Sequence, residues 1–142
     1  MKDTSELLKE CNAGIKMGVS SIEEVLDRVE SDKMKNILSS SKEEHQRLGS
    51  ETRELLNELG LEGKEPNPMA KGMSWLKTNV MMSMDDRDST VADLITDGCN
   101  MGVKSLNKYL NQYKAADEKA KDIAKKLINM EAKLAVDLRE YL

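Results

Sequence analysis

This chain is poor in the residues that build most catalytic and metal centres. Its 142 residues include one histidine, two cysteines, two prolines, one tryptophan, three tyrosines and no phenylalanine. A single histidine leaves little for acid–base chemistry, and we find no HExxH motif, no CxxC motif and no glycine-rich phosphate loop after a strand. The sequence therefore argues against several enzyme classes, and it identifies no reaction.

Long apolar runs are also missing. No segment approaches the roughly 18 apolar residues typical of a membrane-spanning helix, and the first ten residues, MKDTSELLKE, lack the apolar region of a secretory signal. Charged residues make up 34% of the chain and the net charge is −4, so a nucleic-acid or anionic-membrane surface is not expected. We therefore expect a soluble cytoplasmic protein with no nucleic-acid or membrane partner.

The chain does contain a repeated pattern. The segment CNAGIK at 11–16 recurs as CNMGVK at 99–104, and residues 32–56 align without a gap on residues 118–142. The offsets between the paired segments are 88 and 86 residues, so the two halves differ by two residues near a turn. We interpret the protein as one helical hairpin used twice.

Apolar residues recur at spacings of three and four over four long segments, which predicts four amphipathic helices and no strand. We expect helices at 4–30, 31–59, 88–113 and 116–142, with a core of Leu, Ile, Val, Met and Ala. Asp3 and Glu6 resemble a capping box for the first helix, and Gly60 before Leu61 predicts a Schellman stop for the second. Gly14 and Gly18, inside the first helix, predict close approach of a neighbouring backbone.

Four apolar residues lie off the main stripes of these helices: Leu7, Val25, Leu38 and Leu94. They either form a second apolar face, suited to a dimer, or widen the core-facing stripe to the breadth that a globular bundle needs. The sequence leaves both alternatives open.

Between the two hairpins, at 4–60 and 88–142, we expect a connector with its own helix at 67–84. This helix is methionine-rich, and the candidate interaction residues on it are Trp75, Met73 and Met81. A connector of this length can travel most of the bundle, so the second and third long helices can run parallel. That is the single-crossover topology of ferritin-like bundles, here within one domain of 1–142.

Several motifs resemble a bacterial ferritin-like family that lacks an assigned function. They are the connector segment KGMSWLK, the Asp-rich break that follows it, the Asn-x-Gly-Ile of residues 12–15, and Cys99, Gly102 and Tyr109 in the third long helix. The resemblance covers nearly the whole chain. It implies an all-α ferritin-like four-helix bundle and supplies no reaction.

Ferritin-like proteins with a two-metal centre use a Glu from each of two helices and a Glu-x-x-His pair from each of the other two. This chain departs from that pattern. The residue three before His45 is Lys42, and Glu131, the repeat mate of His45, is followed three residues later by Leu134. We therefore expect no di-iron centre.

A reduced site for a single divalent metal is the alternative. His45, Glu44 and Glu131 fall near one level of the helical stripes, and Glu10, Glu23 or Asp97 can approach from the first and third long helices. One His with two or three carboxylates can hold one divalent ion. In the competing interpretation, His45 and Glu44 lie at the edge of the core and bond to neighbouring helices or solvent.

The two cysteines, Cys11 and Cys99, have no His nearby and are expected to be inert buried thiols at different levels of the bundle. Taken together, the residues favour a non-catalytic helical protein with no cofactor that acts through self-association, as a homodimer, or through protein partners. The alternative function is that of a degenerate ferritin-like metal-binding protein using His45 and nearby carboxylates.

Overall fold

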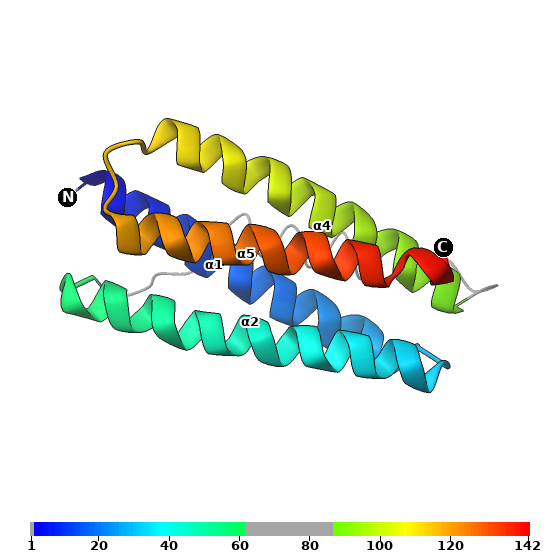
Figure 1. The fold of residues 1–142 in the computed structure, drawn as a ribbon. Helices are drawn as coiled ribbons and strands as arrows, with labels where there is room; N and C mark the ends of the chain where they lie inside the picture. Colours follow the sequence, from blue (N-terminus) through cyan, green and yellow to red (C-terminus); the bar gives the residue numbers. More distant parts are fainter. Residues whose placement is uncertain (1, 62–86) are drawn as a thin grey trace.

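The computed structural model describes residues 2–61 and 87–142. Its helices are α1 (Lys2–Leu26), α2 (Asp32–Glu58), α4 (Arg87–Gln112), α5 (Glu118–Asp137) and the short 3₁₀ helix η1 (Arg139–Tyr141) (Figure 1). These ranges contain no strand, which confirms the all-α prediction for them, and none of their helices has the length and apolar content that crossing a bilayer requires. The helix predicted at 67–84, with Trp75, Met73 and Met81, lies outside the described residues.

The long helices form a bundle whose directions are visible in Figure 1. Helices α1 and α2 are antiparallel, α4 and α5 are antiparallel, and α2 runs parallel to α4. The end of α2 and the start of α4 therefore lie at opposite ends of the bundle, an arrangement that the expected length of the connector allows. Helices α1 and α5 each contact the three other long helices, whereas α2 and α4 each pack mainly against α1 and α5.

Both ends of α2 follow signals in the sequence. Ser31 is the N-cap, and its hydroxyl accepts a hydrogen bond from the amide three residues later at 3.2 Å. At the other end Gly60 has φ +69°, a conformation that glycine adopts without strain. The Gly60 amide donates to the carbonyl of Asn57 and the Leu61 amide to that of Leu56, each at 2.9 Å. This is the predicted Schellman stop.

The ends of α1 and α5 differ from the prediction. Helix α1 ends at Leu26 rather than at residue 30, because the amides of residues 28 and 29 bond to carbonyls three residues back in a tightened last turn. That turn keeps Val29 in the core, at 3% exposed. Helix α5 ends at Asp137 rather than at the C-terminus, where η1 folds Tyr141 back against the core while Leu138 stays fully buried.

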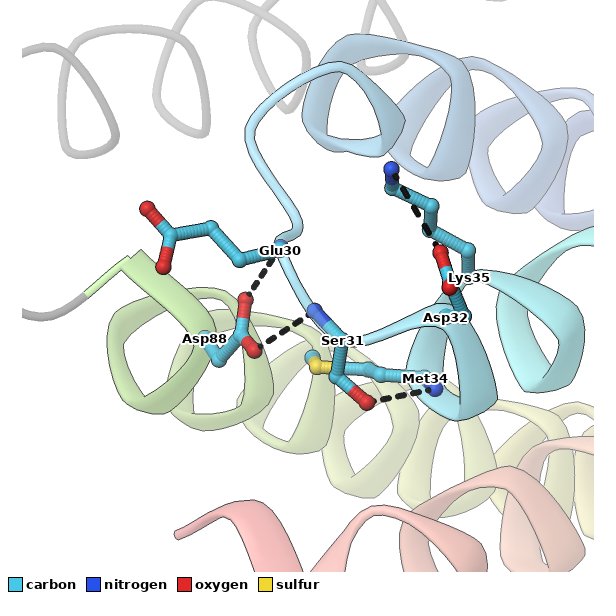
Figure 2. A network of polar contacts seen from close by, with 6 residues as sticks. All are labelled: Glu30, Ser31, Asp32, Met34, Lys35 and Asp88. Carbon is cyan, nitrogen blue, oxygen red and sulfur yellow. Dashed lines mark hydrogen bonds and ion pairs between the residues drawn. The ribbon is translucent and has the colours of Figure 1, made fainter.

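Asp88, in the first turn of α4, holds the turn between α1 and α2. Its two carboxylate oxygens accept hydrogen bonds from the backbone amides of Glu30 at 2.7 Å and Ser31 at 3.0 Å (Figure 2). Hydrogen bonds to a charged acceptor are stronger than neutral ones. Asp88 therefore fastens the first hairpin to the start of the second.

The turn between α4 and α5 is held from α1 in the same way. The Asp3 carboxylate accepts from the Ala115 amide at 3.0 Å, and the Thr4 hydroxyl accepts from the Asp117 amide at 2.8 Å. Asp3 lies inside α1, so the predicted capping box with Glu6 is wrong. The carboxylate bonds across the bundle because the exposed amides of the second turn lie beside the start of α1.

The core consists of two apolar clusters. The cluster at the α1–α2 turn comprises Ile22, Val25, Val29, Met34, Leu38, Val91, Ala92, Leu94, Ile95, Cys99, Leu134 and Leu138. The cluster at the α4–α5 turn comprises Leu7, Leu8, Cys11, Ile15, Leu48, Leu56, Leu106, Ala116, Ala120, Ile123, Ala124 and Leu127. Cys11 and Cys99 belong to different clusters and are free thiols, as expected.

The off-stripe residues are part of this core. Leu7, Val25 and Leu38 are fully buried and Leu94 is 8% exposed. They widen the core-facing stripes, so they do not form a second apolar face. The first of the two alternatives is excluded because each long helix packs against more than one neighbour and buries a broad arc.

Replacing Asp88 by Ala should remove both hydrogen bonds to the α1–α2 turn. We expect the free energy of unfolding to fall by about 1–3 kcal/mol, measured by urea denaturation. Asp93→Ala is the matched control, since Asp93 is an exposed carboxylate on the same helix. Equal effects of the two substitutions would contradict the role given to Asp88.

Candidate functional site

The two apolar clusters are separated by a polar layer in the middle of the bundle. Each long helix contributes to both clusters, and the residues between the two contributions include Gly18 of α1, His45 of α2, Gly102 of α4 and Glu131 of α5. We call these four residues the central layer. His45 is 1% exposed and Glu131 is 8% exposed, so an ionisable pair lies where apolar packing is interrupted.

The His45 ring is held by α2 on one side and by α5 on the other. Its Nδ1 lies 2.7 Å from the Ser41 carbonyl oxygen, and because a carbonyl only accepts, Nδ1 carries a hydrogen and donates it. Its Nε2 lies 3.4 Å from Oε1 of Glu131. A carboxylate opposite Nε2 favours a second ring proton, so the arrangement is that of an imidazolium paired with a carboxylate.

The surroundings of His45 act on its pKa in opposite directions. Burial lowers this pKa because it disfavours the charged ring, whereas the hydrogen bond and the charge of Glu131 raise it. The Ser41 carbonyl and the Glu44 charge add to the increase, and the net result is a pKa above the ordinary 6.5. The pair therefore favours the charged form of His45 more than water does.

The two buried thiols have different surroundings. Burial first, and then the charge and hydrogen bonding of Glu131, raise the pKa of Cys99. Burial and the charge of Glu10 raise the pKa of Cys11 to about 12. Neither thiol is a thiolate near neutral pH, so neither is an activated nucleophile.

Glycine at position 18 makes room for the imidazole. A Cβ atom there would come 2.8 Å from Cδ2 and 3.0 Å from Nε2 of His45, closer than carbon atoms pack. A Cβ at Gly102 would lie 3.6 Å from the Glu131 carboxyl carbon, and one at Gly14 would lie 3.5 Å from Cδ2 of Leu127. The prediction that a neighbouring backbone approaches Gly14 and Gly18 is therefore wrong, because side chains of other helices lie against both glycines.

The structure brings together only part of the predicted ligand set. His45 and Glu131 meet in the central layer, but Glu44 is partly exposed and borders a groove of about 270 Å³ between α2 and α5. Glu10 lies near Tyr109 instead, where burial first and then the charge and hydrogen bonding of Glu10 raise the pKa of the tyrosine. Glu10 lies eight residues from Gly18, about 12 Å along α1. Within residues 2–61 and 87–142, no three His, Cys, Asp or Glu side chains are grouped to hold a metal ion.

Sequence reasoning missed three parts of this site. The Ser41 carbonyl is invisible to any side-chain pattern, and the contact of Cys99 with Glu131 joins helices that no local motif connects. Gly102 belongs to a motif that carries the ferritin-like resemblance, but its proximity to Glu131 depends on how α4 lies on α5. The sequence feature that could have located the site is the pair of polar residues Ser41 and His45 in the otherwise apolar core-facing row of α2, and both residues are buried.

The raised pKa of His45 should make stability depend on pH in a defined direction. A histidine whose pKa is higher in the folded state contributes stability that is complete below pH 6.5 and is lost as the pH rises through the folded-state pKa. The difference in unfolding free energy between the native chain and His45→Gln should therefore shrink with rising pH in urea denaturation. Because this is the only histidine, its ring ¹H resonance reports the pKa directly, and a midpoint below 6.5 would contradict the ion pair.

Gly18→Ala and Gly14→Ala form a matched pair in α1, since both replacements gain about 1 kcal/mol of helix propensity. Only the first crowds His45, so we expect Gly18→Ala to lower the unfolding free energy by about 1–3 kcal/mol relative to Gly14→Ala. Thermal and urea denaturation measure the difference. Equal stability of the two variants would show that the ring is not packed against Gly18.

Comparison of the chain with protein-family models, curated proteins and solved structures gives no match. The ferritin-like resemblance therefore stays a prediction, and the functional argument depends on the geometry of the central layer.

Proposed function

We propose that this chain is a non-catalytic ferritin-like bundle of two repeated hairpins that acts through self-association or protein partners. The parallel course of α2 and α4 supports the ferritin-like assignment, because a single long crossover between hairpins produces that arrangement. Ser31 and Asp117, the N-caps of α2 and α5, are 86 residues apart, which is the offset of the second repeat.

The observation that carries the proposal is the composition of the central layer. A two-metal centre would need a Glu from each of two helices and a Glu-x-x-His pair from each of the others. Here α1 and α4 place Gly18 and Gly102 against the pair, and the layer supplies one His and one Glu. The Nδ1 of His45 is bonded to Ser41 and its Nε2 faces Glu131, so the polar atoms of this layer bond to the protein itself.

A protein that works by contact needs apolar surface for its partner. Among the described residues, the large apolar side chains that remain well exposed are Met101 at 61%, Val136 at 49% and Leu142 at 58%. Val136 and Leu142 lie near the end of the chain, and Val136 lines a hollow next to Lys33 and Ile37 of α2. The predicted interaction residues Trp75, Met73 and Met81 would add to such a surface.

The second candidate is a degenerate ferritin-like protein that binds a single divalent metal. It is favoured by one observation, the convergence of His45 Nε2 and Glu131 Oε1 in a buried place. A metal there would require a deprotonated Nε2 and a further donor, since protein metal centres commonly use three or more protein ligands. These requirements make it the weaker candidate.

Metal binding decides between the two candidates. The untagged protein would be analysed for bound metals and titrated anaerobically with Fe(II), Mn(II) and Zn(II), alongside His45→Gln, Glu131→Gln and the control Glu44→Gln. We expect no stoichiometric binding, or binding that the first two substitutions leave unchanged. One equivalent of metal that is lost in both of these variants, and retained in the control, would establish the metal-binding function instead.

A further inference from the structure

The groove between α2 and α5 carries charged side chains in an order that is complementary to the same order reversed. On α2 it is lined by Lys33, Asn36, Ile37, Ser40, Ser41 and Glu44, which recur at intervals of three and four and so share one face. A positive charge lies at one end of this face and a negative charge at the other. Asn36, Ser40 and Ser41 between them have short side chains that allow another helix to approach closely.

The α5 side of the groove carries one charge of each sign, Lys133 and Asp137. The register of α5 against α2 is set by three contacts: Lys33–Glu140 at 2.7 Å, His45–Glu131 at 3.4 Å and Glu51–Lys126 at 3.3 Å. In this antiparallel register Lys133 lies beside the Ser40–Ser41 part of α2, and Asp137 lies beside the Asn36–Ile37 part.

If a second copy of the groove is turned end for end and laid against the first, side chains of opposite charge face each other. Lys33 of one copy then faces Glu44 of a second copy, and Asn36 faces Ser41. The same reversal brings Lys133 to the level of Asp137 in the second copy. The groove has two positive and two negative side chains, and every one of them meets the opposite sign, which is the self-complementarity that a twofold interface requires.

Apolar groups lie inside and beside these charges. Ile37 and Met130 are partly buried and Val136 is 49% exposed at the border of an adjoining hollow, above Leu134, which belongs to the core. The local ion pairs Lys33–Glu140 and Lys133–Asp137 have exposed side chains, so exchanging them for contacts with a second copy costs little. An apolar centre with a charged rim is the usual composition of a protein interface.

We propose that the α2–α5 groove is a homodimer interface at which a second copy of this chain docks in antiparallel orientation, with Lys33 against Glu44 across a twofold axis. This inference rests on the proposed function, self-association or binding of a protein partner, and it identifies the partner as a second copy of the chain. This charge order favours a second copy over an unrelated protein, because turning the groove end for end brings each of its charges against one of the opposite sign.

Sedimentation equilibrium of the full chain in EDTA tests this proposal. Glu44→Lys should raise the dimer dissociation constant about tenfold or more by opposing like charges twice, and the double variant Lys33→Glu with Glu44→Lys should restore it. Val136→Glu should also weaken the dimer, whereas Met101→Glu, at an exposed apolar residue on α4, should not. Circular dichroism and thermal denaturation show that each variant is folded.

A chain that stays monomeric up to about 0.5 mM would overturn the proposal. So would a dimer that Glu44→Lys and Val136→Glu leave unchanged, or one that Met101→Glu weakens equally. In either of the last two cases the chain still forms a dimer, so self-association is retained and only the proposed interface is wrong. Failure of the proposed function has a different signature, the stoichiometric metal binding that depends on His45 and Glu131.

Discussion

The contact between His45 and Glu131 is the interaction on which the rest of this bundle depends. It joins α2 to α5 between the two apolar clusters, where an unpaired charge would be costly. Because the imidazole lies against α1, residue 18 has to lack a side chain. One buried polar pair thus constrains a residue on a third helix and is one of the contacts that define the register in which α2 and α5 meet.

The ends of the bundle are held by a different kind of contact. Asp88 closes the α1–α2 turn, and Asp3 with Thr4 closes the α4–α5 turn, so each hairpin is fastened by the first helix of the other. Burial of the apolar clusters supplies most of the stability. The polar contacts at both ends and at the centre specify how the two hairpins lie on each other.

This arrangement has a consequence for function. The middle of the bundle interior is occupied by His45 and Glu131, a pair that is bonded to its own helices. Chemistry at that level would compete with the interactions that hold the helices in register. Recognition at the outer surface carries no such conflict, and the α2–α5 groove combines apolar and oppositely charged side chains that suit contact with another copy.

Local patterns determined the approximate positions of the four long helices, the N-cap at Ser31, the stop at Gly60 and the polar interruption of the α2 stripe, because each depends on residues within one or two turns. Only the tertiary structure decided that His45 rather than Glu44 is buried, that Leu7 and Val25 belong to the core, and that Asp3 bonds across the bundle. Those outcomes depend on how segments more than 80 residues apart approach each other. Helix periodicity defines an apolar face, but the neighbours of a side chain on that face are chosen by packing.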